Sequence, residues 1–173
     1  MKKRTVCLIL FAALVLVAGL FPLHVLQIED PRKERVVFVR SLQPGDCFSL
    51  MYRHSVELCL VWDYFRIDGE YRIILDETVF GSSNAGLPSV LGDGERFTRG
   101  ATASRISNMR RILPAVEIWV NRRYENTLEF GGRKIHLPEL AGDTLLRLSI
   151  RKVILFEFLY EKMNSLINRM KRR

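Results

Sequence analysis

Side chains that commonly bind metals or act as nucleophiles are scarce in this chain, which has three cysteines and three histidines in 173 residues. No Cys-x-x-Cys, His-x-His or Gly-x-Ser-x-Gly sequence occurs. Metal sites and serine hydrolase sites generally use such spacings, because these bring metal ligands, or a nucleophile and its supporting groups, together. The sequence therefore predicts no metal site, no cofactor and no catalytic residues. We expect a protein that binds a partner and is not an enzyme.

Three cysteines do not by themselves indicate a set of disulfides. Cys7 lies in the apolar N-terminal segment, which leaves Cys47 and Cys59 in strand-like sequence. Two interpretations are open for this pair. The thiols form a disulfide if neighbouring strands bring their Cβ atoms close together in an oxidising compartment, or they stay reduced and are buried as small apolar side chains.

The body of the chain also lacks a net charge. The whole chain has a formal charge of +8, but residues 28–150 contain 17 basic and 17 acidic side chains. The excess lies in residues 1–27, with three basic side chains, and in residues 151–173, with seven basic and two acidic ones. A neutral body lacks the basic surface that binds phosphates, so we expect no nucleic-acid partner, whereas basic ends beside apolar segments suit an anionic membrane.

What the chain does have is a long apolar N-terminal run. Met1-Lys2-Lys3-Arg4 precedes sixteen apolar or small residues, Val6 to Phe21, and the apolar character continues to Ile28. This pattern predicts a transmembrane helix within residues 1–28 that acts as a signal anchor, and the absence of an Ala-x-Ala site favours an uncleaved one. A cleaved signal and a buried core helix are the alternatives.

The charges beside the predicted anchor do not decide its orientation by number alone. Basic residues lie on both sides of it, at Lys2 to Arg4 and again at Arg32 to Arg40. A very short basic N-terminus normally stays in the cytoplasm, whereas a long following domain is translocated largely regardless of its charge. We therefore expect a single-pass protein of the cell membrane whose body is extracytoplasmic.

After a charged juxtamembrane linker, residues 29–34, short apolar runs alternate with turn sequences. Gln43-Pro44-Gly45-Asp46 is a turn sequence, Asp68-Gly69 is a strong signal for a hairpin, and Gly131-Gly132 indicates a second hairpin. Residues 80–108 are rich in Gly and Ser and predict a long loop. The fold class predicted for residues 35–150 is mainly β, a small antiparallel β-sandwich-like domain.

The periodicity changes at the end of the chain. Apolar residues recur at spacings of three and four from Phe156 to Met170, which predicts a basic amphipathic helix in residues 151–173, with its helical part at Lys152 to Met170. Three roles are open for its apolar face. It packs across the sheet as part of the core, it lies on a membrane surface, or it docks on a partner in the bilayer.

The densest group of reactive side chains is Tyr52-Arg53-His54-Ser55-Val56-Glu57. In an extended segment Tyr52 and His54 share one face, and Ser55 and Glu57 share the other. His54 therefore cannot act as a base for the adjacent Ser55 without a bend, and we expect these four residues to form a polar recognition site. The plainer interpretation is a histidine bonded to backbone and a solvated glutamate.

Four short motifs follow one another along the body: Tyr52-x-His54-Ser55-Val56-Glu57, Trp62 in a following aromatic strand, Phe80-Gly81, and Ala85-Gly86-Leu87-Pro88. Over about residues 35–150 the chain resembles the bacterial and archaeal family of domain of unknown function 1850. The resemblance implies a small exported or anchored accessory protein that is found beside the membrane subunits of TRAP-type transporters of the TAXI class. It brings no catalytic residue with it.

The resemblance implies importance only for the positions that match, which are Tyr52, His54, Ser55, Glu57, Gly86 and Pro88. We expect a transporter membrane subunit or a solute-binding protein to contact the face that carries His54 and the Ser82 to Pro88 loop. Cys59 and the basic C-terminal helix depart from the family pattern, so the resemblance says nothing about the role of residues 152–173. A structural module of the cell envelope is the alternative function, and a hydrolase that uses Ser55 or Glu57 is a weaker one.

Overall fold

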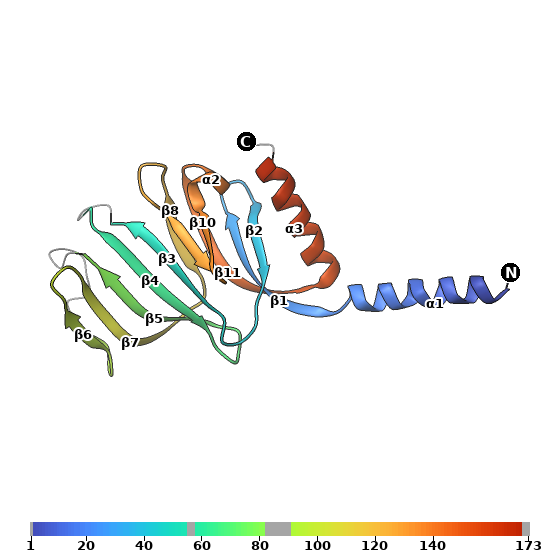
Figure 1. The fold of residues 1–173 in the computed structure, drawn as a ribbon, viewed down its shortest axis with the longest axis horizontal. Helices are drawn as coiled ribbons and strands as arrows, with labels where there is room; N and C mark the ends of the chain where they lie inside the picture. Colours follow the sequence, from blue (N-terminus) through green and yellow to red (C-terminus); the bar gives the residue numbers. More distant parts are fainter. Residues whose placement is uncertain (1, 55–57, 82–90, 171–173) are drawn as a thin grey trace.

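The computed structural model describes residues 2–54, 58–81 and 91–170. Within them the alternating strands of the body form two antiparallel sheets that share one core, which confirms a mainly β, sandwich-like fold (Figure 1). The four-stranded sheet has the order β2 (Arg35–Ser41), β1 (Pro22–Asp30), β11 (Thr144–Ile154) and β8 (Val116–Val120). The seven-stranded sheet has the order β10 (Arg133–His136), β9 (Thr127–Phe130), β3 (Cys47–Arg53), β4 (Leu60–Ile67), β5 (Ile73–Phe80), β7 (Ser104–Leu113) and β6 (Arg96–Arg99). The helices are α1 (Lys2–Gly19), α2 (Leu137–Ala141) and α3 (Leu155–Met170).

The core lies between the facing sides of the two sheets. Leu26 of β1 and Leu148 of β11 meet Leu50 of β3 and Leu128 of β9 there, and each is almost completely buried. Phe48 stacks on Phe65 across the β3–β4 pair, with ring centroids 4.8 Å apart. Each fully buried aliphatic or aromatic side chain stabilises the fold by about 1.5–3 kcal/mol.

The N-terminal helix is shorter than the apolar sequence. We predicted an anchor over residues 1–28, but α1 ends at Gly19 and Pro22–Asp30 forms strand β1. Pro22 has no backbone N–H to continue a helix. Apolar residues occur on both faces of this strand because both faces are covered: Leu26 and Ile28 face the core, and Val25 faces α3. No helix in the part of the chain that the structure describes is both long and apolar enough to cross a membrane.

The predicted hairpins are confirmed by strand pairing. Ile67 pairs with Ile73 around Asp68-Gly69, and Phe130 pairs with Arg133 around Gly131-Gly132, whose φ angles of 55° and 71° suit glycine. The prediction of a long loop over residues 80–108 was partly wrong, because β6 pairs with the first half of β7 inside this range. All four residues of β6 are exposed, so this edge strand shows no apolar alternation. Residues 82–90 lie outside the described residues.

All three cysteines lie in the described part of the chain and are free thiols. Cys47 begins β3 opposite Arg66, whereas Cys59 precedes β4 beyond the pairing of Arg53 with Leu60. The two thiols therefore lie at opposite ends of the same strand pair. This separation excludes the disulfide, and because Cys47 is exposed, the other interpretation, two buried thiols, is also wrong for that residue.

Candidate functional site

A carboxylate occupies a core-facing position of the seven-stranded sheet. Asp63 of β4 lies opposite Leu50 of β3 and Thr78 of β5 in the register of the strands, and Leu50 is buried in the core. Asp63 therefore sits on the inner face, where apolar side chains otherwise predominate. A carboxylate there needs hydrogen bonds, because removal from water disfavours its charged form.

Two hydroxyl groups from the neighbouring strands supply those hydrogen bonds. The Tyr52 hydroxyl donates to Oδ2 of Asp63 at 3.0 Å, and the Thr78 hydroxyl donates to Oδ1 at 2.7 Å. Burial raises the pKa of the Asp63 carboxyl, and the two hydrogen bonds oppose that shift. Burial, and then the negative charge of Asp63, raises the pKa of the Tyr52 phenol, so this hydroxyl stays protonated and remains a donor at neutral pH.

Tyr52 and Asp63, but not Thr78, line a cavity of about 400 Å³ between β3 and β4 on one side and β8 on the other. His54, Trp119 and Tyr124 also line it, so the lining contains both aromatic rings and polar groups. The backbone N–H of His54 donates to the carbonyl of Cys59 at 2.8 Å, which fixes the end of β3. The guanidinium of Arg32 lies 4.7 Å from the centroid of the Trp119 ring.

The turn after β8 forms one wall of the cavity and is held by a buried amide. Oδ1 of Asn126 accepts from the backbone N–H of Asn121 at 3.1 Å, and its Nδ2 donates to the carbonyl of Trp119 at 3.2 Å. The backbone carbonyl of Asn126 accepts from the backbone N–H of Leu137 at 2.9 Å, at the start of α2. Asn126 therefore helps to fix the segment that carries Tyr124, together with Asn121 and Asp143, whose Oδ1 atoms accept from the backbone N–H groups of Arg123 and Arg122.

The structure brings together two of the residues that the sequence indicated. Tyr52 and His54 line the same cavity, whereas Ser55, Glu57, Gly86 and Pro88 lie outside the described residues. A binding role for any of the six stays a prediction. The described arrangement offers a hydrogen-bonded carboxylate, aromatic faces and an imidazole, which suit recognition of polar groups. Among the described residues, no group of three or more His, Cys, Asp or Glu side chains could hold a metal ion.

Sequence reasoning missed Asp63, Thr78 and Asn126. Asp63 carried a usable signal, because it is the one acidic residue in the apolar run Leu60–Ile67 and its phase places it on the inward side. Thr78 and Asn126 carried no comparable signal, since Thr is ordinary in strands and Asn is ordinary in turns.

The comparisons with known proteins bear on the same part of the chain. Residues 48–137 match the family described as Domain of unknown function (DUF1850), and the matched region includes Tyr52, Asp63 and Asn126. Strands β1 and β11 and helices α1 and α3 lie outside it. No curated protein and no solved structure matches the chain. Because the match covers more than half of the sequence, the chain belongs to the domain of unknown function 1850 family.

Proposed function

We propose that the protein is a membrane-attached, extracytoplasmic accessory protein without catalytic activity, which acts beside a TRAP-type transporter of the TAXI class. Family membership supports the choice of transporter only through the resemblance described above. Attachment to the membrane is supported by the surface of α1. The cavity at Tyr52, His54 and Asp63 is the candidate contact for a transporter membrane subunit or a solute-binding protein.

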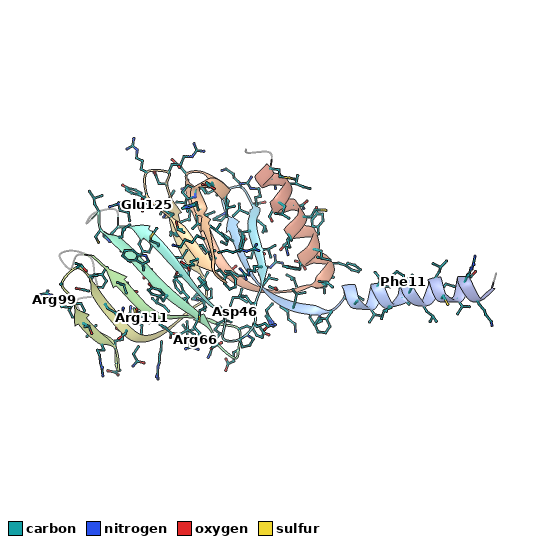
Figure 2. The ribbon with its side chains drawn as sticks, in the orientation of Figure 1. Phe11, Asp46, Arg66, Arg99, Arg111 and Glu125 are labelled. Carbon is teal, nitrogen blue, oxygen red and sulfur yellow. The ribbon has the colours of Figure 1, made fainter. Side chains whose placement is uncertain are left out.

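One observation carries the attachment. Every large apolar side chain from Val6 to Phe21 is exposed, with exposed fractions between 44% and 69%, and these side chains occur on all sides of the helix. Figure 2 shows Phe11 on α1, well away from the sheets. A helix that is apolar all round is stable when something apolar surrounds it, as lipid does.

The length of α1 limits how it meets a bilayer. The apolar part of α1, the fourteen residues from Val6 to Gly19, spans about 21 Å, whereas the hydrocarbon layer is about 30 Å thick. Lys3 and Arg4 precede this segment, and long basic side chains reach toward the headgroups from within the layer. The proposed insertion therefore places these basic residues at the cytoplasmic headgroups and the β domain on the other side.

Cell fractionation tests the attachment. The full chain is expected in the membrane pellet after an alkaline carbonate wash, and protease added to intact spheroplasts is expected to digest the β domain. A chain with Leu10→Asp and Leu14→Asp should move to the soluble fraction. Ile112→Asp is the matched control, because Ile112 is 55% exposed on β7 and should not affect the distribution. A wild-type chain in the soluble fraction would contradict the proposal.

Co-purification tests the partner. In mild detergent the full chain is expected to recover a transporter membrane subunit or its solute-binding protein, and His54→Ala should reduce the yield of that partner. A chain that always elutes alone would refute the transporter role. If His54→Ala leaves function intact while removal of α3 abolishes it, the protein is instead a structural module of the cell envelope.

A further inference from the structure

Helix α3 is turned so that its polar side faces the body. The side chains of Glu157, Phe158, Glu161, Asn164 and Asn168 are buried or half-buried against the four-stranded sheet. The opposite side of the helix is apolar and exposed, with fractions between 37% and 68%, and consists of Phe156, Leu159, Tyr160, Met163, Leu166, Ile167 and Met170. A surface helix normally buries its apolar stripe against the core. Here the stripe points outward. Of the roles that the sequence left open for it, packing across the sheet as part of the core is therefore excluded.

A charged cluster holds the polar side in place. One guanidinium nitrogen of Arg151 donates to Glu157 at 2.9 Å, and the other donates to Glu161 at 3.3 Å and to the buried Gln27 of β1 at 2.8 Å. Below the helix, Phe158 packs into an apolar cluster with Val25 of β1 and residues of β2 and β11. The orientation of α3 is therefore fixed by specific contacts, and its outward stripe is a consequence of them.

The outward stripe of α3 is continuous with the apolar surface of α1. Strands β1 and β11 pair from Pro22 with Ile154, so α1 enters and α3 leaves the sheet at one corner. The backbone N–H of Leu155 donates to the carbonyl of Phe21 at 3.0 Å, and the ring of Phe156 touches Gly19. Figure 1 shows that α1 runs away from the body while α3 lies across that direction, on the side of the body from which α1 leaves.

Basic residues accompany the stripe. Lys162 is exposed along one edge of it, and in the sequence Lys171, Arg172 and Arg173 follow α3. The two acidic residues of α3, Glu157 and Glu161, are turned to Arg151 on the other side. An apolar stripe with a basic border complements an anionic lipid surface, where acyl chains cover the stripe and headgroups meet the cations.

We propose that α3 lies in the plane of the membrane, with its apolar stripe among the acyl chains and its basic border at anionic headgroups. The inference deepens the proposed function, because it assumes the same membrane that α1 enters. Helix α3 runs across the axis of α1, which is the direction expected of a helix in the membrane plane beside a helix that enters the membrane. A second copy of this chain fits the stripe less well, because self-pairing would bring two basic borders together. In this arrangement the body is held at two points and has one fixed orientation on the bilayer.

The test uses the full chain reconstituted into vesicles that contain brominated phosphatidylcholine, either alone or mixed with phosphatidylglycerol. Leu166→Trp reports from the stripe, and Ile112→Trp, on the exposed side of β7, is the matched control. Emission of the parent chain, which contains Trp62 and Trp119, is subtracted. We expect bromine to quench the Leu166→Trp emission in anionic vesicles, and salt to restore that emission. The Ile112→Trp emission should be quenched less, and to the same extent in both lipid mixtures.

Flotation of the same samples separates the two proposals. A chain that floats with both lipid mixtures but shows no quenching of Leu166→Trp overturns the role of α3 and leaves the attachment through α1 intact. A chain that floats only with anionic vesicles supports α3 and overturns attachment through α1, and one that never floats overturns both. In cells, a photo-crosslinker at Leu166 should form lipid adducts, and adducts with a partner protein or a second copy would overturn the lipid assignment.

Discussion

The ring of Phe156 lies directly on Gly19, so closely that a Cβ atom added to residue 19 would overlap it. The contact joins the last turn of α1 to the first turn of α3, two helices at opposite ends of the sequence. The neighbouring hydrogen bond between Leu155 and Phe21 fixes the same junction through the backbone. The directions in which the two helices leave the body are therefore set together.

Gly19→Val should disturb this junction. The added side chain must displace the Phe156 ring, and we expect faster amide hydrogen exchange in the first turn of α3. Phe156→Ala removes the obstacle, so the double variant should exchange no faster than Phe156→Ala alone. Residues in contact typically show interaction free energies of about 0.5–3 kcal/mol. Strictly additive effects of the two substitutions would contradict the contact.

Phe158→Ala should release α3 from the sheet. Phe158 is 8% exposed and packs on Val25, Val39 and Val153, so truncation leaves a cavity that we expect to cost about 3 kcal/mol. Tyr160→Ala is the matched control, because Tyr160 is 62% exposed two residues later and should change the free energy of unfolding very little. Trypsin cleavage after Lys162 measures the release, and equal cleavage of the two variants would refute the packing described for α3.

Arg151→Gln should destabilise the protein more at neutral pH than in acid. Burial raises the pKa of Glu161, and the charge of Arg151 opposes that shift. Oε2 of Glu161 is also buried without a hydrogen-bond partner among the described residues. Without Arg151 the ionised carboxylate loses its nearest cation, at an expected cost of about 1 kcal/mol for this partly exposed pair.

The pH dependence follows from protonation of the same carboxyl. Below its ordinary pKa of 4.5 Glu161 carries a proton in both folded and unfolded chains, so the cost of Arg151→Gln should shrink. Urea unfolding at the two pH values measures the difference. In a Glu161→Gln background, the contribution of this carboxyl to that difference should be absent.

Asp63→Asn should reveal the titration of the inner carboxylate. Because burial raises its pKa, folded Asp63 binds more protons than unfolded Asp63, and the free energy of unfolding falls as pH rises through the interval that begins at 3.8. The wild-type chain should therefore lose stability relative to Asp63→Asn between acidic and neutral pH. Tyr52→Phe removes a hydrogen bond that lowers this pKa, so it should make the loss larger. A difference that is independent of pH would refute the burial of Asp63.

Local patterns predicted the strands and turns well, because alternation along β3 and β11 and the turn residues Asp68-Gly69 act within a few residues. They failed at β1, whose second face is covered by a helix that follows it more than a hundred residues later. The period of α3 predicted its stripe but not the side on which the body lies. That side is set by Arg151 and Phe158, which only the folded sheet brings into place.

The candidate site was predicted in part for a similar reason. Tyr52 and His54 are close in sequence and share one face, so alternation alone brings them to one cavity. Asp63 reaches Tyr52 only through the pairing of β3 with β4, and Asn126 reaches the cavity wall through the turn that connects β8 of one sheet to β9 of the other. Cross-strand partners of this kind depend on register, which single-residue patterns do not specify.

Pairing of β1 with β11 also determines the order of assembly during synthesis. Strand β1 is among the first segments to leave the ribosome, yet its partner begins at Thr144 and is made last but for α3. Until then β1 pairs at most with β2, and one backbone edge of an apolar strand remains open to other chains. A chain that stops before Thr144 would therefore keep β3, β4 and β5 but leave the four-stranded sheet unclosed, with an aggregation-prone strand next to the apolar helix α1.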